Sequence, residues 1–307
     1  MARKPRIQFA GAIYHLIGRG NYRKALFDQD GAGFAFKIAL GECSTRCGWK
    51  VHAYVLIKNH YHLVVETPDG NLVEGMRWLL GVFGTRFNRF RKEAGHVFQG
   101  RYNALLVEPG SSLVRVVDYV YLNLVRAKLV EVSELPCYSR SSLPKYFEGK
   151  RPVWLRRDHF LEELGLPNNA RGMRSYLERF KALEEADPKN SESLSKESCL
   201  GWAIGTLGYR KALAEEFSKM TLARDWGGPE LRELNEERWD QMGVYELKRW
   251  KKTEADIMRS RKGAVWKREV AVKLRRETSA SNPLITERLN TGHPSYISKW
   301  LGVMPKF

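Results

Sequence analysis

Two apolar, β-branched stretches, residues 49–58 and 61–66, are separated by only Asn59 and His60, and this spacing constrains the fold more than any other feature. Stretches of this composition and length are typical of β-strands. Parallel strands need a long crossover connection, whereas antiparallel strands can be joined by a very short one. The sequence therefore predicts an antiparallel strand pair with a tight connection near Asn59.

Two histidines, His60 and His62, stand one residue apart at the start of the second stretch. In a strand, residues i and i+2 project from the same face, so both imidazoles point the same way while Tyr61 points away. Two convergent neutral imidazoles are a common start to a divalent-metal site. Two histidines on the solvated face of a strand have the same spacing, and spacing alone favours that ordinary arrangement.

Residues 111–126 have the pattern of an amphipathic helix. Tyr119 and Asn123 are four residues apart and therefore lie one turn apart on one helix face, while Tyr121 points elsewhere. A helix whose tyrosine packs at the edge of a core has the same pattern, so this pair indicates a site only in combination with other residues. The apolar residues at helical spacing are Leu113, Val117, Val120 and Leu124.

The remaining elements of the first half complete a recognisable order. A first strand is expected over residues 12–17, helices over residues 30–47 and from Asn71 onward, and a fourth strand over residues 102–108. Asn71 followed by Glu74 predicts a variant of the helix-capping box. The order β-α-β-β-α-β, then α, is typical of an α+β, ferredoxin-like antiparallel sheet with helices on one face.

Several ordered motifs together resemble one family. Residues 11–21, the His60-Tyr61-His62 triplet, residues 98–102, and Tyr119 with residues 123–127 resemble the single-tyrosine HUH transposases of the IS200-like superfamily. The resemblance is strongest to the REP-associated tyrosine transposases and covers about the first half of the chain. The sequence departs from the family pattern at Lys58, Leu124 and Lys128. None of these departures removes a functional group.

The resemblance implies a fold, a reaction and a site. Residues 1–150 would form the HUH catalytic domain, which nicks and rejoins single-stranded, hairpin-forming DNA. Tyr119 would attack the scissile phosphorus and leave a 5′-phosphotyrosine bond and a free 3′-OH. His60 and His62, with Asn123 as third ligand, would hold a divalent ion. Mg²⁺ or Mn²⁺ is expected, because an amide oxygen and open coordination positions suit harder ions.

The charge of the chain favours a polyanionic partner. It has 52 Lys and Arg against 35 Asp and Glu, a net charge of +17 and a pI near 9.7. Nucleic acid is the expected partner, and a membrane surface is less so because the basic residues are spread over several helices. The sequence has no membrane-length apolar run, no signal peptide and no disulfide framework in its four cysteines. We expect a cytoplasmic, bacterial nucleoid-associated protein, as a monomer or homodimer.

The second half of the chain is mostly helical and more charged. Residues 151–225 are expected to connect the catalytic domain to a basic, helical DNA-binding region over residues 226–307. Residues 184–198 have the composition of an exposed link, and residues 226–229 break the chain. Between residues 248 and 276, Lys and Arg greatly outnumber Asp and Glu, which is typical of nucleic-acid-binding helices.

Residues 284–301 have the pattern helix, glycine turn, helix. A helix over residues 284–290 is followed by a turn containing Gly292, then by a second helix with Pro294 in its first turn. This is the pattern of a helix-turn-helix whose second helix enters the major groove of DNA. A packed helical hairpin without DNA contacts is the alternative.

The residues expected to contact nucleic acid come from both regions. They are basic or polar residues on the strands and helices nearest to the expected active site and to the helix-turn-helix. They are Arg19, Arg86, Arg89, Arg101, Arg126, Arg268, Arg275, Ser295, Tyr296 and Lys299.

Two other function classes remain open. A DNA-binding repressor or domesticated transposase relative without catalysis would use the same basic helices, but it would not need His60, His62, Tyr119 and Asn123 together. A zinc hydrolase using the two histidines is weaker, because the chain has no H-E-x-x-H motif.

Overall fold

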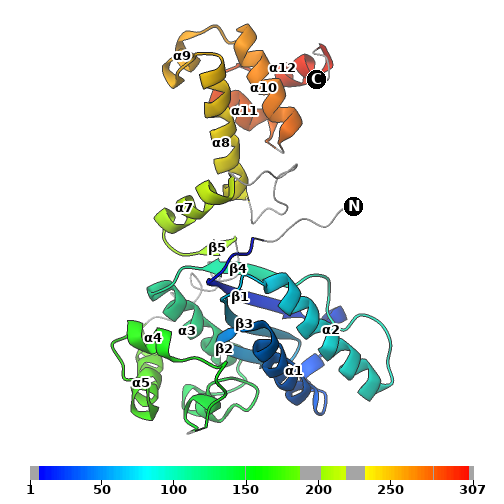
Figure 1. Ribbon diagram of the computed structural model, residues 1–307, viewed down its shortest axis with the longest axis vertical. Helices are drawn as coiled ribbons and strands as arrows, with labels where there is room; N and C mark the ends of the chain where they lie inside the picture. Colours follow the sequence, from blue (N-terminus) through cyan, green and yellow to red (C-terminus); the bar gives the residue numbers. More distant parts are fainter. Residues whose placement is uncertain (1–6, 149, 187–201, 219–231, 279, 304–307) are drawn as a thin grey trace. The chain divides into compact units, whose positions relative to one another are not determined.

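A computed structural model describes residues 7–148, 150–186, 202–218, 232–278 and 280–303 (Figure 1). Contacts divide the chain into two compact units, one spanning Arg6–Thr206 and the other beginning at Leu207. Each unit is described by itself below. In the described parts of the chain, no helix combines the length and apolarity needed to cross a membrane.

The first unit is built on a five-stranded sheet with the order β2-β3-β1-β4-β5. The strands β1 to β4 pair antiparallel, as expected. The fifth strand pairs parallel to β4, so the sheet is mixed and not wholly antiparallel. A short strand on the β4 edge covers backbone groups that an open edge would leave unpaired. The strands are β1 (Ala12–Arg19), β2 (Lys50–Ile57), β3 (His60–Thr67), β4 (Asn103–Val107) and β5 (Ala203–Ile204).

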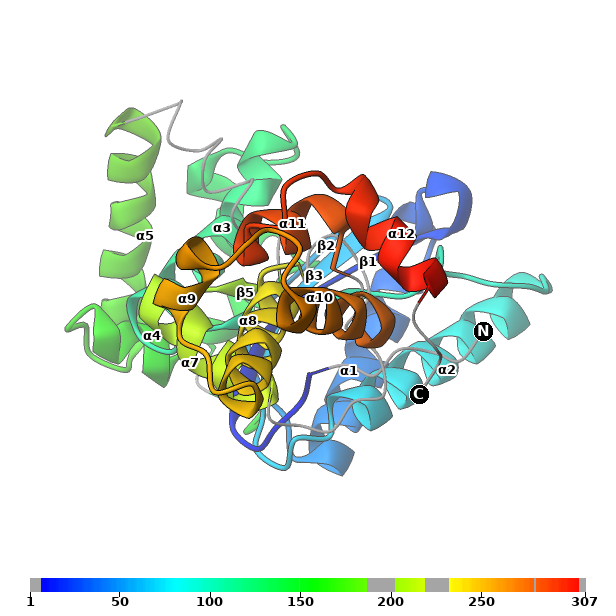
Figure 2. The ribbon, with the colours of Figure 1, turned by 90° about the horizontal axis from the view of Figure 1, so that it is seen from above.

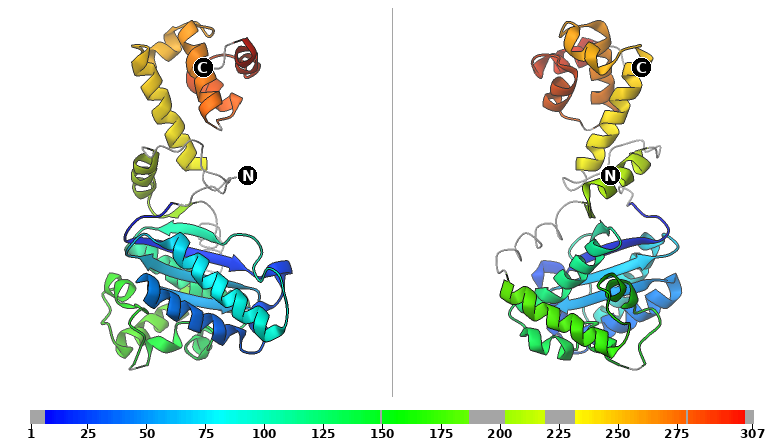
Figure 3. Two further views of the ribbon diagram at one scale, coloured as in Figure 1. Left: turned by 45° about the vertical axis from the view of Figure 1, so that its right-hand side comes forward. Right: turned by 90° about the vertical axis from the view of Figure 1, so that its left-hand side faces the viewer.

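The helices α1 (Ala32–Cys47) and α2 (Leu72–Arg91) lie side by side on one face of this sheet (Figure 3). Phe36 of α1 and Phe83 of α2 pack together, and Phe36 also contacts Tyr61 of β3. The helix α3 (Ser111–Arg126) lies on the opposite face, where Tyr119 meets the residues of β3 that alternate with Tyr61. The sequence predicts helices on one face of the sheet, and α1 and α2 have that arrangement. The helix α3 covers the opposite face of the sheet.

Tyr61 fixes the packing of the α1/α2 face near the end of the strand pair. Its partner in the β1 register is Gly18, and a Cβ at that position would lie 2.3 Å from the Tyr61 hydroxyl oxygen. Only glycine leaves room for the ring. The tyrosine between the two histidines is therefore a core residue of this face, which turns both histidines to the other face.

The capping box expected at Asn71 does not form. Asn71 precedes α2, but its side chain accepts a hydrogen bond from Trp49 Nε1 at 2.8 Å and donates to Cys47 O at 2.9 Å. The amide therefore ties the start of α2 to the end of α1. The long-range partners satisfy the side chain better than a local cap, because both are buried or half-buried groups that need one.

The chain beyond residue 150 packs on the first unit. Arg156 N donates to Val51 O at 2.8 Å, and Tyr176 donates to the buried carboxylate of Asp118 at 2.8 Å. Residues 151–186, expected to act as a connection, thus complete the α3 face. Most of the expected link at residues 184–198, and the break at residues 226–229, lie outside the described residues. The helices of residues 151–186 are α4 (Asp158–Glu163) and α5 (Ala170–Ala186).

Four short 3-10 helices complete the first unit. Two of them, η1 (Asn21–Arg23) and η2 (Leu26–Asp28), follow β1, and the other two, η3 (Val132–Cys137) and η4 (Pro144–Tyr146), follow α3.

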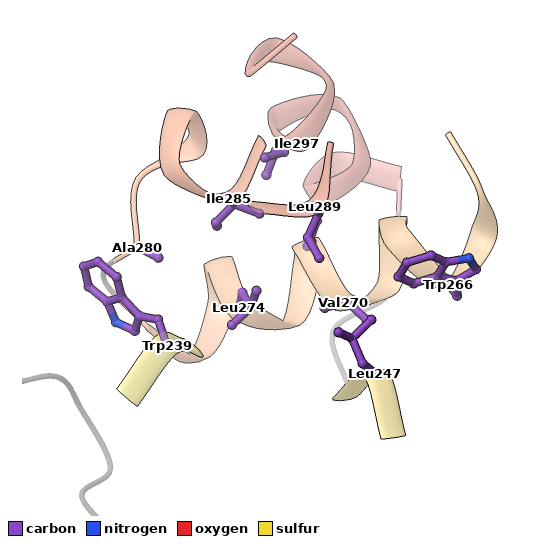
Figure 4. Close-up of a cluster of buried hydrophobic side chains, with 10 residues drawn as sticks. Trp239, Leu247, Trp266, Val270, Leu274, Ala280, Ile285, Leu289 and Ile297 are labelled. Carbon is purple, nitrogen blue, oxygen red and sulfur yellow. The ribbon is translucent and has the colours of Figure 1, made fainter. Parts of the chain in front are cut away.

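The second unit is helical, as expected, and α10, α11 and α12 are neighbouring helices in it (Figure 2). Its core joins Trp239 and Leu247 of α8 to Trp266 and Val270 of α10 and to Ile285 of α11 (Figure 4). The unit thus has an apolar core of its own. Its helices are α7 (Leu207–Ser218), α8 (Arg232–Arg249), α9 (Glu254–Arg259), α10 (Val265–Glu277), α11 (Asn282–Leu289) and α12 (Ser295–Val303).

Candidate nuclease site

The two histidines of β3 and the tyrosine of α3 meet on one face of the sheet. The ring centroids of His60 and His62 are 5.1 Å apart, and the His62 centroid is 5.9 Å from that of Tyr119. His62 is buried and His60 is half-buried, so the site opens toward solvent at the His60 end. The face predicted for the histidines and the helix predicted for Tyr119 are thus brought together.

A third histidine, His15 of β1, contacts His62 through a ring nitrogen and by ring stacking. His15 Nε2 lies 3.0 Å from His62 Nδ1, and the two rings are stacked. The other ring nitrogen of His62, Nε2, is buried and has no hydrogen-bond partner among the described residues. A nitrogen that is buried and unpaired in this way is prepared for a ligand. His15 is not among the site residues predicted from the sequence. The one feature that could have indicated it is its position as a histidine in an otherwise apolar strand.

Burial keeps both β3 imidazoles neutral. It lowers the pKa of His60 to about 4, with a further contribution from the positive charge of Arg19. It lowers the pKa of His62 well below the ordinary value, and the neighbouring His15, His60 and Arg19 act in the same direction. Neutral imidazole is the form that binds metal ions, so the protonation state of both residues at neutral pH is compatible with a metal ligand.

Tyr119 and Asn123 occupy one face of α3, as their spacing predicted. The Asn123 side-chain nitrogen donates to the backbone carbonyl of Tyr119 at 2.9 Å, which engages the nitrogen of the amide. The side-chain oxygen is the atom that a metal ion would use. The Arg126 guanidinium lies 5.4 Å from the centre of the Tyr119 ring, within the range of a cation–π contact.

Tyr121 lies in a different environment. Its hydroxyl is 2.7 Å from Ser142 Oγ, and its ring packs against Phe180 of α5. Burial raises the pKa of the Tyr121 phenol. The neighbouring tyrosine is therefore a core residue, and the helix register gives Tyr119 alone of the two to the histidine face.

The basic residues expected to contact nucleic acid in the first unit are mostly exposed. Arg19 pairs with His60 in the β1–β3 register, at the open end of the site. Arg89 and Arg101 are exposed, whereas Arg86 forms an ion pair with Glu42 at 2.8 Å. Arg19 thus lies beside the histidines. The ion pair with Glu42 partly neutralises the charge of Arg86.

The expected residues of the second unit surround α12. Ser295, Tyr296 and Lys299 are exposed along this helix. Arg268 lies with its guanidinium 5.9 Å from the Trp300 ring, and Arg275 donates to Asn282 at 3.0 Å. The exposed residues of α12 suit a contact surface, whereas Arg275 is half-buried and engaged by Asn282.

The turn between α11 and α12 has the expected position. Asn290 ends α11 in the left-handed conformation, with φ of 47°, and Gly292 has φ of 98°. The second helix begins at Ser295, one residue after Pro294. The two helices and their turn are present, and DNA binding by them stays a prediction.

Some of the basic residues of the second unit have structural roles. Lys267 is fully buried, and its ammonium donates to the carbonyls of Ile257, Ser260 and Asn290 at 2.6, 3.2 and 3.3 Å. Lys273 pairs with the buried Glu246 at 2.7 Å. The excess of Lys and Arg in this region therefore overstates the charge available to a polyanion.

Two histidines on one face of a sheet beside a helical tyrosine form the arrangement that the resemblance to single-tyrosine HUH transposases predicts. Residues 8–123 match the family described as IS200-like transposases. The match covers most of the strands and helices that carry the histidines and Tyr119, and it ends at Asn123. That match supports a transposase-like DNA endonuclease as the class of protein.

Comparison with solved structures gives two similar chains. A REP-associated tyrosine transposase bound to a REP hairpin is 16% identical, with a TM-score of 0.41, covering 48% of this chain and 85% of that one. A protein described as a transposase from Deinococcus radiodurans R1 is 20% identical, with a TM-score of 0.29, covering 42% of this chain and 92% of that one. A search of curated proteins finds no match.

Proposed function

We propose that the first unit nicks and rejoins single-stranded DNA at hairpin-forming, REP-like sites, with Tyr119 as the nucleophile and a divalent metal as cofactor. The observation that carries this proposal is the meeting of Tyr119 with His62, whose Nε2 is buried and unpaired. A protein that only binds DNA has no use for such an arrangement, because a buried unpaired polar atom costs stability.

Tyr119 supplies the covalent chemistry. Its phenol oxygen attacks the scissile phosphorus, a P–O bond forms to Tyr119, and the bond from phosphorus to the 3′ oxygen breaks. The phenol proton is lost and the departing 3′ oxygen ends as a hydroxyl. Attack by a 3′-OH on the phosphotyrosine reverses these changes and rejoins the strand.

His60, His62 and Asn123 are the proposed metal ligands. They fit a divalent ion because both imidazoles are kept neutral by burial and because His62 Nε2 has no other partner. When bound, Mg²⁺ or Mn²⁺ would polarise a non-bridging phosphate oxygen and stabilise charge on the leaving oxygen. His15 holds the ring of His62 in a fixed orientation from the opposite side.

The substrate class rests on the sequence motifs and on charge. The motifs of the first half resemble most closely those of the REP-associated transposases, for which hairpin-forming DNA is the expected substrate. Arg19 stands at the open end of the site, where a DNA backbone would enter. Exposed cations beside a phosphodiester site contribute affinity through release of condensed counterions.

The test compares Tyr119→Phe with Tyr121→Phe in the full-length protein. Each substitution removes one hydroxyl and leaves the ring in place. The protein is incubated with single-stranded DNA that carries a hairpin and a 3′ label, and a covalent adduct is detected on a denaturing gel. We expect no adduct with Tyr119→Phe and a retained adduct with Tyr121→Phe, because only Tyr119 faces the histidines.

The opposite pattern, an adduct that survives Tyr119→Phe and disappears with Tyr121→Phe, would overturn the assignment of the nucleophile and of Asn123 with it. DNA binding by the wild-type protein without any adduct would instead support the non-catalytic, DNA-binding alternative. Binding of the hairpin DNA by Tyr119→Phe serves as the control for folding.

A further inference from the structure

A second cluster of metal-ligating side chains lies in the first unit, outside the site described above. It consists of His52 on β2, Glu66 on β3 and His159 on α4, and the ligand atoms of these three residues all lie within 4.8 Å of one another. The rings of His52 and His159 have centroids 5.2 Å apart, and His52 Nε2 is 3.6 Å from Glu66 Oε2. Three different elements thus converge on one point.

Three buried polar atoms of this cluster lack hydrogen-bond partners among the described residues. Both ring nitrogens of His52, which is fully buried, and Oε2 of Glu66, which is also buried, have none among the described residues. Buried polar atoms are nearly always paired, and each exception requires an explanation. The 3.6 Å separation of His52 and Glu66 is longer than a hydrogen bond, so the two residues do not satisfy each other.

Lys50 forms an ion pair with only one of the two oxygens of the Glu66 carboxylate. Its ammonium lies 2.6 Å from Oε1, which is not the oxygen that lacks a partner. Oε2 therefore stays available for a ligand, while Lys50 reduces the negative charge that the cluster offers. A site with two imidazoles and one shared carboxylate selects ions that bind imidazole well, and not ions that need many oxygens.

We propose that His52, Glu66 and His159 bind a zinc-like divalent ion at a site separate from that of His60 and His62. Glu66 and His62 lie four residues apart on β3, which corresponds to about 13 Å along a strand. One ion cannot bridge that distance. The two sites share the strand and the face, but they use different ligands.

Binding an ion would require the three ligand atoms, now within 4.8 Å of one another, to move only slightly closer together. In a tetrahedral zinc site with metal–ligand distances near 2.0–2.1 Å, the ligand atoms are roughly 3.3 Å apart. His159 is the member that can move, since it reaches the surface on the six-residue helix α4. Its position near the surface also allows a water molecule to complete the coordination.

The expected role of this ion is structural. The segment before α4 is bound to β2 through Val51 N to Trp154 O at 2.7 Å and Arg156 N to Val51 O at 2.8 Å. An ion held by His52, Glu66 and His159 would cross-link the same segment to two strands of the sheet. Metal binding that exists only in the folded state stabilises that state.

The test measures zinc binding to the metal-free, full-length protein by equilibrium dialysis and elemental analysis. His159→Ala is compared with the double variant His60→Ala/His62→Ala and with His96→Ala, which removes an exposed histidine of the same unit. We expect His159→Ala to bind one ion fewer per chain than wild type. His96→Ala should match wild type, and the double variant should still lose a further ion when His159→Ala is added.

A second measurement does not depend on any variant at this site. In the wild-type protein and in His60→Ala/His62→Ala, Zn²⁺ should slow amide hydrogen exchange in residues 151–163. The proposal is overturned if His159→Ala binds as much zinc as wild type, or if zinc leaves exchange in this segment unchanged. Neither result depends on whether the nuclease site works, because both comparisons hold in the double variant.

Discussion

At the scale of single residues, His15 is the clearest positioning residue of the nuclease site. It contacts the proposed ligand His62 and not the substrate, through the 3.0 Å contact between His15 Nε2 and His62 Nδ1. We expect His15→Phe to keep the stacked ring but to weaken metal affinity by about 10–100-fold. The measurement is nicking rate against Mn²⁺ concentration. A purely structural role would lower the maximal rate without raising the Mn²⁺ concentration needed for half of it.

Metal dependence is the second prediction at this scale. His62→Ala should strongly lower nicking and weaken Mg²⁺ or Mn²⁺ binding at the nuclease site while the protein stays folded, because it removes one ligand of a few. Removal of divalent ions by EDTA should stop nicking by the wild-type protein, and added Mg²⁺ or Mn²⁺ should restore it. Unchanged cleavage in EDTA would contradict the assignment of His60, His62 and Asn123 as metal ligands.

At the scale of elements, α10 combines structural and exposed lysines and arginines. Lys267→Met should lower the free energy of unfolding by about 1–3 kcal/mol, because three part-buried carbonyls lose the ammonium of a buried lysine as their donor. Lys262→Met is the matched control, since that side chain is exposed, and its effect should stay within about 0.5 kcal/mol. Urea denaturation measures both. Equal effects would show that the buried hydrogen bonds contribute nothing.

The exposed face of α12 gives a second element-scale prediction. Lys299→Ala should lower the slope of log affinity against log salt for duplex or hairpin DNA by about 0.9 if this lysine contacts one phosphate. Lys181→Ala, an exposed change on α5, should leave the slope unchanged. Identical slopes for Lys299→Ala and the wild type would favour a packed helical hairpin over a DNA-binding helix-turn-helix.

At the scale of the whole molecule, the two units are expected to divide catalysis from binding. A chain that ends at Thr206 retains the sheet, α3 and the residues that pack on them, so it should fold and form the tyrosine adduct. Its affinity for hairpin DNA should fall and depend less steeply on salt, because the phosphate contacts of the second unit are lost. Filter binding over a salt series measures this. An unchanged salt slope would assign all DNA contacts to the first unit.

The sequence by itself determined the order of elements and the face of each proposed site residue. Strand period and a two-residue connection fix the β2–β3 pair, and helical spacing puts Tyr119 with Asn123 and away from Tyr121, because these relations are local. The same local reasoning failed at Asn71, whose amide found partners on Trp49 and Cys47 in place of a cap.

Only the tertiary structure decided which distant residues meet. His15 reaches His62 across a strand pairing, β5 turns an antiparallel sheet into a mixed one, and His159 joins His52 and Glu66 from a helix far along the chain. Burial, which neutralises the two β3 histidines and places Lys267 inside the second unit, likewise depends on the whole packed chain. Contacts and burial are sums over residues remote in sequence, and no local pattern encodes them.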